Sequence, residues 1–154
     1  MKLRVVSLGH KLPEWARMAC AEYYRRLPRA YALESIELKP QARSGRTPEQ
    51  VLSQEAQSIA GAVRDFHVVA LDEKGAAWTT TTLASRLSAW RDAGLAVAFV
   101  IGSADGLAPA VKQNADVTLA LSALTLPHAL ARVVLAEQIY RAVTVIEGHP
   151  YHRD

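Results

Sequence analysis

A short polar segment near the end of the chain, HPYHRD at 149–154, concentrates side chains that could handle a nucleobase. Tyr151 or the imidazoles of His149 and His152 could stack on a base, while Arg153 could hydrogen-bond its carbonyl oxygens or a phosphate. A histidine can also accept a proton near neutral pH. The alternative is an inert, frayed chain end. A zinc site on the two histidines would lack further ligands, so no metal is expected.

The segment follows a helix, predicted over His128–Ile146, that is apolar around most of its circumference. Arg132 lies among leucines and valines on this helix. Its charge therefore needs a partner, which is either a carboxylate or an anionic ligand. A single sheet covers only one side of such a helix, and a homodimer interface would cover the rest.

Three segments that follow predicted strands could carry a ligand site. The first is LDEKG at 71–75. In the second, IGSADG at 101–106, two glycines permit positive φ and close backbone approach, although a plain strand-to-helix turn explains them equally well. In the third, LSALTLP at 121–127, an apolar loop could recognise a flat neutral ring such as adenine through its backbone groups. A loop tucked under another element is the alternative.

The elements that would position these segments alternate along the chain. Strands are predicted at 2–8, 33–38, 66–71, 96–101 and 117–121. Helices are predicted at 14–27, 48–62, 80–93, after Pro109, and at 128–146. Alternation of this kind predicts one α/β domain over 1–154, with a mostly parallel sheet of five to six strands flanked by helices. Ligands then bind beyond the carboxyl ends of the strands.

Composition agrees with one globular domain in a reducing compartment. The chain has 154 residues, half of them hydrophobic, and a single cysteine, Cys20, which is expected to pack as a small apolar side chain. No apolar run is long enough to span a bilayer and the start does not resemble a signal peptide, so the cytoplasm is expected and a membrane is not. Residues 1–46 carry ten Lys or Arg against four Asp or Glu. This excess suits a polyanion such as RNA, or simply a solvated surface.

Taken together, these segments resemble the RlmH family of SPOUT methyltransferases. The matching pieces are VVSLGHKLPEW at 5–15, LDEKG at 71–75, FVIGSADGL at 99–107, LSALTLPHALARVVLAEQIYRA at 121–142 and HPYHR at 149–153. No piece is diagnostic alone, but their order and spacing are specific and they span nearly the whole chain. One departure is Ser103, where the family usually has a second glycine. Serine would be strained there if the position needed positive φ.

The resemblance implies a SPOUT α/β knot, in which the C-terminal segment threads through a loop to form a deep trefoil knot. It also implies a homodimer that builds each site from both chains, and S-adenosyl-L-methionine as cofactor. The implied reaction is methylation of N3 of a pseudouridine in the 23S ribosomal RNA of the ribosome, pseudouridine-1915 in the family. The implied cofactor contacts are Leu71, Gly102, Leu121, Ser122, Ala123, Leu124, Thr125 and Leu126.

The residues expected to act on the nucleobase are His128, Arg132, Tyr151 and Arg153. His128 is the first candidate for a base or an orienting group, and Tyr151 would hold or stack the base. Arg153, with Arg132, would stabilise negative charge on the carbonyl oxygens as the N3 proton leaves. Phosphates of the RNA would be contacted by Arg25, Arg26, Arg29, Arg43 and Arg46. Two alternatives stay open: a SPOUT enzyme with another RNA target (a ribose 2′-hydroxyl or a transfer RNA), and a non-catalytic RNA-binding relative.

Overall fold

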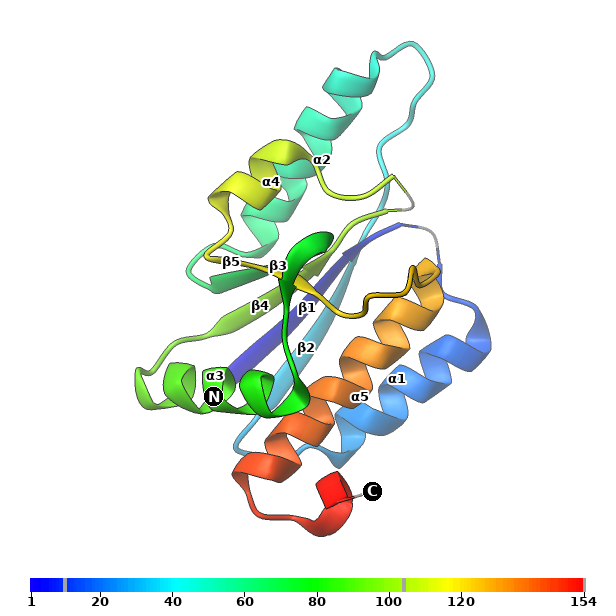
Figure 1. The fold of residues 1–154 in the computed structure, drawn as a ribbon. Helices are drawn as coiled ribbons and strands as arrows, with labels where there is room; N and C mark the ends of the chain where they lie inside the picture. The colour runs from blue at the N-terminus through cyan, green and yellow to red at the C-terminus, as the bar shows by residue number, and fades with distance from the viewer. Residues whose placement is uncertain (10, 104, 154) are drawn as a thin grey trace.

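The computed structural model describes residues 1–9, 11–103 and 105–153, and it holds one five-stranded parallel sheet (Figure 1). The strand order is β2-β1-β4-β3-β5, and every pairing is parallel. The strands are β1 (Lys2–Leu8), β2 (Ala32–Leu38), β3 (His67–Ala77), β4 (Val97–Ile101) and β5 (Val117–Ala120). The α/β class predicted from the sequence is therefore confirmed. His10, Ala104 and Asp154, which fall within the sequence motifs, lie outside the described residues.

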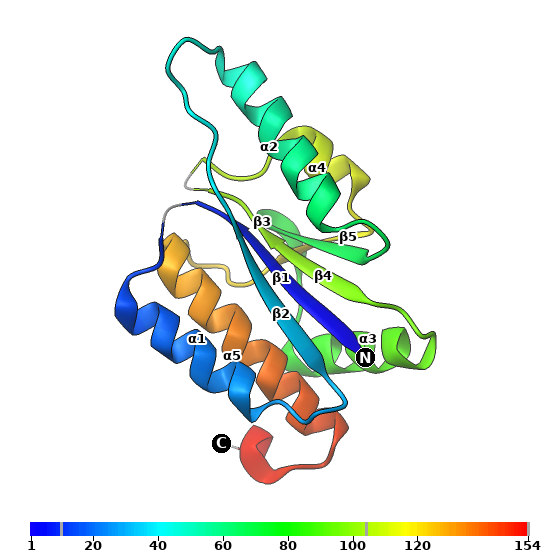
Figure 2. The same ribbon diagram turned by 180° about the vertical axis from the view of Figure 1, so that it is seen from behind.

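Helices cover both faces of the sheet (Figures 1 and 2). They are α1 (Glu14–Arg26), α2 (Pro48–Ala62), α3 (Thr80–Asp92), α4 (Pro109–Asn114) and α5 (His128–Ile146), with a final 3-10 turn, η1 (Pro150–Arg153). α1, α3 and α5 lie on one face, where Leu87, Leu135 and Ile139 join strand residues such as Phe99 in one core. α2 and α4 lie on the other face over a second core. Alternate strand residues feed the two cores, as the period of two requires.

Several element boundaries follow from local sequence signals. The N-cap side chain of Thr47 accepts a hydrogen bond from the Gln50 N–H, and the Gln50 side chain accepts one from the Thr47 N–H, which is the capping box expected at the start of α2. α5 has the predicted bounds and follows directly on Pro127. β4 is buried along its whole length, in keeping with its continuous apolar sequence.

The prediction that β3 ends at Leu71 is wrong. The strand continues to Ala77, and Leu71 and Ala76 both pair with Leu119 of β5, so that the residues between them form a bulge. A Cβ on Gly75 would lie 2.6 Å from the Leu119 carbonyl carbon, so only glycine fits this crossing of the two backbones. The polar LDEKG segment is thus a bulge inside a strand and not a loop after one.

α5 is covered more completely within one chain than its apolar sequence suggested. It lies against the sheet between α1 and α3 and buries eight of its residues. Packing within one chain therefore covers most of the apolar surface of α5, and a dimer interface is not needed to cover it. Among the described residues, no helix is both long and apolar enough to cross a membrane.

Candidate active site

The carboxyl edge of the sheet brings together the start of α5 and the ends of three strands. Arg132 Nη2 lies 3.0 Å from Glu37 Oε1, and Glu37 is the last residue but one of β2. His128, one turn before Arg132, lies close to the backbone of Gly9, where a Cβ would be 3.5 Å from His128 Nε2. Its ring also interacts with the Gly102 backbone after β4. We call His128, Arg132, Glu37, Gly9 and Gly102 the carboxyl-edge cluster.

The partner of Arg132 is therefore a carboxylate. The arginine side chain is 4% exposed and that of Glu37 is 47% exposed, so a buried cation meets a partly solvated anion. Nε of Arg132 is buried and has no hydrogen-bond partner among the described residues. Leaving such a donor unpaired is costly, and an acceptor supplied by water or a ligand would relieve the cost.

His128 is held as a neutral imidazole. Burial and the adjacent positive charge of Arg132 lower its pKa, while hydrogen bonding to the Gly102 backbone and the charge of Glu37 act in the opposite direction. Its Nε2 is buried, with no partner in the described part of the chain. In this arrangement Nε2 does not face solvent, which favours an orienting role over that of a directly accessible base.

A further group of buried polar side chains lies beneath the carboxyl-edge cluster, and sequence reasoning missed it. Ser7 Oγ is buried without a hydrogen-bond partner within the described ranges, and the Tyr24 hydroxyl is buried beside Cys20 and Ser35. Burial also raises the pKa values of Tyr24 and Cys20, while the positive charge of Arg132 acts to lower both. Cys20 is 4% exposed, as expected for a packed cysteine. Glu37 could have been found from its position in β2. It lies two residues after Ser35 and four after Leu33, so all three side chains are on the face that packs on α5.

The loop after β4 is tight at both glycines. A Cβ on Gly102 would lie 2.5 Å from the carbonyl carbon of Gly106, and Gly106 itself has φ +82°. The Gly106 N–H donates to the Ser103 carbonyl at 2.9 Å. Ser103 is not among the positive-φ residues, so the serine is accommodated without backbone strain. Positive φ is thus confirmed at Gly106, whereas Gly102 closely approaches the backbone of its own loop, and its approach to a ligand stays a prediction.

The loop between β5 and α5 exposes apolar surface. Leu124 is 77% exposed, and its N–H donates to the Ser122 hydroxyl at 2.9 Å. Leu121, Ser122 and Leu126 are half-buried, whereas Ala123 and Thr125 are exposed. An exposed leucine flanked by backbone groups outside any sheet or helix could receive a flat ring, as adenine recognition requires. A surface hollow of about 640 Å³ lies elsewhere, along the first half of α2.

The C-terminal segment 149–153, which we call the tail, is held by contacts. The Tyr151 hydroxyl donates to Glu137 Oε1 at 3.2 Å, and its ring lies 4.7 Å from that of Tyr140. Burial and the neighbouring Tyr23 and Glu137 raise the pKa of Tyr151 to about 12, so the phenol stays protonated near neutral pH. Arg153 is exposed. The tail is therefore not a frayed end.

The structure does not bring the tail and His128 together within one chain (Figure 2). The tail packs on the last turns of α5, whereas His128 begins that helix. Glu137, to which the Tyr151 hydroxyl donates, lies nine residues after His128, which corresponds to about 14 Å along the helix axis. Tyr151 and Arg153 thus cannot act on a group bound at His128 of the same chain.

The five arginines expected to bind RNA also fall into two groups. Arg25 and Arg26, at the end of α1, both pair with Glu22, and Arg29 follows them on the amino edge of the sheet. Arg43 and Arg46 follow β2 on the carboxyl edge, where Arg43 pairs with Asp105 of the glycine loop. In one chain they do not form a single patch. No group of three or more His, Cys, Asp or Glu in the described ranges could hold a metal ion.

Comparison with known proteins identifies the family. The family described as "Predicted SPOUT methyltransferase" matches residues 1–152. The chain belongs to the SPOUT methyltransferase family. It is 51% identical to proteins named "Ribosomal RNA large subunit methyltransferase H" from Burkholderia mallei and Burkholderia pseudomallei, over 99% of this chain and 99% of each relative. The resemblance to the RlmH family is thereby confirmed along the whole chain.

Solved structures show the same fold at low sequence identity. A methylase family protein from Haemophilus influenzae superposes with a TM-score of 0.60 at 16% identity, covering 97% of this chain and 69% of that one. Another, from Neisseria gonorrhoeae, gives a TM-score of 0.56 at 15% identity, covering 90% and 81%. The arrangement of the sheet and helices is thus shared with these two proteins.

Proposed function

We propose that this protein transfers a methyl group from S-adenosyl-L-methionine to N3 of a pseudouridine in the 23S ribosomal RNA of the ribosome. The observation that carries the proposal is 51% identity, over 99% of both chains, to relatives named for methylation of large-subunit ribosomal RNA. The family whose model matches the chain is one of methyltransferases. Ribosomal RNA as the substrate would place the protein in the cytoplasm.

The cofactor would bind at the carboxyl edge of the sheet. Gly102, Leu71 and the residues 121–126 would hold it, the exposed Leu124 and half-buried Leu126 packing against the adenine. The fit rests on the tight glycine loop, which has no room for a Cβ at Gly102, and on the backbone groups of the apolar loop. When bound, the cofactor supplies an electrophilic methyl group and a neutral leaving group.

The residues of the chain would then align the base and handle one proton. Neutral His128 would orient the base or its proton, because its pKa is lowered by burial and by Arg132. Arg132, whose Nε–H has no hydrogen-bond partner among the described residues, and Arg153 would hydrogen-bond the carbonyl oxygens that flank N3. These oxygens gain negative charge as N3 loses its proton, so the arginines would stabilise the transition state more than the ground state.

We infer that two copies of the chain build each site. The tail packs on the second half of α5, out of reach of His128 in the same chain, so a second chain whose α5 runs in the opposite direction would bring its Tyr151 and Arg153 to the carboxyl-edge cluster. Exposed apolar side chains on the neighbouring helices α1 and α5 suit such an interface: Trp15 is 55% exposed, Met18 59% and Leu130 38%. Tyr151, packed on its own helix, would shape the tail, and Arg153 would reach the base.

The same pairing would join the two groups of arginines. Arg25, Arg26 and Arg29 of one chain, at the amino edge, would come near Arg43 and Arg46 of the other, at the carboxyl edge. Together they would contact phosphates around the modified nucleotide. The trefoil knot remains a prediction from the family resemblance, and the single domain over 1–154 remains a prediction from the sequence.

Methyl transfer to ribosomes, with mass spectrometry of the product nucleoside, tests the proposal. N3-methylpseudouridine is expected with the wild type, and activity should fall by at least a hundredfold in Arg153→Ala, which removes a charge-stabilising donor (about 10²–10³ for such a group). A 2′-O-methyl nucleoside or a methylated transfer RNA would show another SPOUT target. Absence of both methylation and cofactor binding by calorimetry would show a non-catalytic RNA-binding protein.

A further inference from the structure

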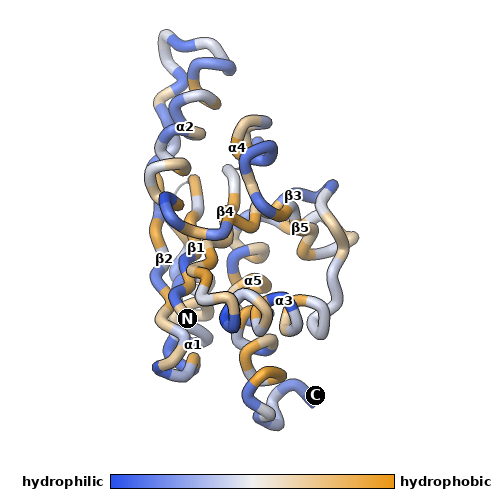
Figure 3. The backbone as a smooth tube through the Cα atoms, turned by 90° about the vertical axis from the view of Figure 1, so that its left-hand side faces the viewer, coloured by the Kyte–Doolittle hydropathy of each residue, from blue (hydrophilic) through white to orange (hydrophobic). Residues whose placement is uncertain are grey.

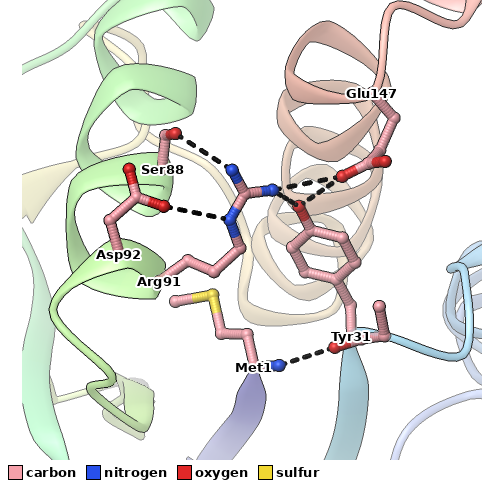
Figure 4. A network of polar contacts seen from close by, with 7 residues as sticks. Met1, Tyr31, Ser88, Arg91, Asp92 and Glu147 are labelled. Atoms are coloured by element: carbon pink, nitrogen blue, oxygen red, sulfur yellow. Dashed lines mark hydrogen bonds and ion pairs between the residues drawn. The ribbon is translucent and has the colours of Figure 1, made fainter.

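A hydrogen-bonded network joins three elements at the amino edge of the sheet, on the side remote from His128 (Figure 4). The Tyr31 hydroxyl donates to Glu147 Oε1 at 2.8 Å, and Arg91 Nη1 donates to the Tyr31 oxygen at 2.7 Å. Arg91 Nη1 also lies 3.2 Å from Glu147 Oε1. Tyr31 directly precedes β2, Arg91 lies in the last turn of α3, and Glu147 is the C-cap of α5. We call these three residues the Tyr31–Arg91–Glu147 network.

Glu147 is the point from which the tail leaves α5. The next residue, Gly148, has φ +68°, and the His149 N–H donates back to the Thr144 carbonyl at 2.9 Å. This geometry ends the helix and reverses the chain direction. The position of Glu147 therefore fixes where the tail starts and where it points.

A second set of contacts fixes the other half of the tail. The Tyr151 ring packs on Tyr140, its hydroxyl donates to Glu137, and the Arg141 guanidinium lies 4.9 Å from the ring centre. Arg153 follows and is exposed. The tail thus has two anchors, the network at its base and Tyr151 in its middle, with an arginine presented beyond them.

The exposure of the network residues suits positioning better than stabilisation. The side chains of Arg91 and Glu147 are 36% and 44% exposed, and ion pairs at such exposure contribute little to stability. Tyr31 is 3% exposed and packs in the main core, so its ring is fixed by the sheet. The Tyr31 hydroxyl therefore donates to Glu147 from a fixed position. Arg91, on α3, donates to the Tyr31 hydroxyl oxygen and to Glu147 Oε1.

We propose that Tyr31 and Arg91 are positioning residues for methyl transfer, which hold Glu147 so that the tail presents Arg153 to the site of a second copy of the chain. The proposal rests on the proposed function. Tyr31 is buried and Arg91 is hydrogen-bonded to Tyr31 and Glu147, so both would act on the reaction through the tail.

The test uses Tyr31→Phe and Arg91→Gln in the full-length protein, with Arg86→Gln as the matched control. Arg86 lies on the same helix, but its guanidinium packs 5.6 Å from the Trp78 ring. Hydrogen exchange of the 148–153 peptide should be about tenfold faster in the two network variants, the effect of losing one hydrogen bond to a charged group, and unchanged in Arg86→Gln. The kcat/KM for ribosomes should fall about three- to tenfold.

A double-mutant cycle separates positioning from general stability. If the network acts through Arg153, Tyr31→Phe should lower kcat/KM in the wild-type background and have no further effect in Arg153→Ala, whose residual activity is read at high enzyme concentration. The proposal would be overturned if Tyr31→Phe lowered kcat/KM equally in both backgrounds. It would also be overturned if hydrogen exchange of the 148–153 peptide were unchanged, or became faster while activity stayed full. Full activity of Arg153→Ala would overturn the proposed site as well. An inactive Arg153→Ala beside a fully active Tyr31→Phe would overturn the positioning role alone.

Discussion

The Arg132–Glu37 ion pair joins a buried cation to a half-exposed anion, and we predict that removing its two partners has unequal effects on stability. The perturbations are Glu37→Gln, which leaves the buried guanidinium with a neutral partner, and Arg132→Met, which removes the cation but keeps a chain of similar length. Because 4% of the arginine side chain and 47% of the glutamate side chain are exposed, water can solvate a lone Glu37 but not a lone Arg132.

The magnitudes follow from that asymmetry. Breaking a fully buried pair by removing one partner costs about 3–5 kcal/mol. Glu37 is only half-buried and a glutamine oxygen can still accept from Arg132, so we expect Glu37→Gln to cost about 1–3 kcal/mol of unfolding free energy. Arg132→Met removes both the buried charge and its unpaired Nε–H, so its unfolding free energy should stay within about 1 kcal/mol of the wild type, with either sign.

Urea denaturation of both variants at one fixed protein concentration measures the difference, since an oligomer's apparent stability depends on concentration. Methyl transfer is measured on the same samples. Arg132→Met should be folded but inactive, because we expect the arginine to serve the reaction and to contribute little to stability. A larger loss of stability in Arg132→Met than in Glu37→Gln would refute this reasoning and make Arg132 a structural residue.

Three further predictions concern single features of the site. NMR titration should give His128 a pKa below its usual value in the wild type and a higher one in Arg132→Met, because the arginine charge lowers it; an unchanged value would contradict the coupling. The folded protein then binds fewer protons at His128 than the unfolded chain, so this contribution to stability is present above about pH 6.5 and is lost as the pH falls towards the lower folded pKa. Gly102→Ala and Gly75→Ala should each cost about 1–3 kcal/mol, because each Cβ would meet backbone atoms at 2.5–2.6 Å. Calorimetry should show weaker S-adenosyl-L-methionine binding in Gly102→Ala by a larger factor than in Gly75→Ala, and equal weakening would argue against cofactor binding at Gly102. Trp15→Glu should shift the protein towards monomer in analytical ultracentrifugation, whereas the control Leu95→Glu, at a site 39% exposed beside β4, should not; a monomeric wild type would remove the proposed interface.

Local sequence signals were enough to predict most of the elements. Pro127 and the apolar periodicity after it fixed α5, and the Thr47–Gln50 capping box fixed the start of α2, because both signals act within one turn of helix. The continuous apolar run of β4 indicated a strand buried on both faces. The motifs shared with the RlmH family then supplied a function that composition could not.

Features that depend on distant partners could not be predicted in this way. The bulge in β3 exists because Leu71 and Ala76 both meet Leu119 on β5, and a polar segment ending in glycine looks like a turn when β5 is not considered. The carboxylate that pairs with Arg132 lies 95 residues earlier in the chain. The tail follows α5 directly in sequence, yet it packs on the second half of that helix, away from His128, so the two could be brought together only by a second copy.

Mixing two inactive variants tests most directly whether each site is shared between chains. His128→Ala and Arg153→Ala proteins would be unfolded together, refolded as a mixture and assayed for methyl transfer to ribosomes. If one chain supplies His128 and the other Arg153, half of the dimers are mixed and one of their two sites is intact, so activity should recover to about a quarter of the wild type. Activity no higher than that of the two variants alone would contradict the shared site.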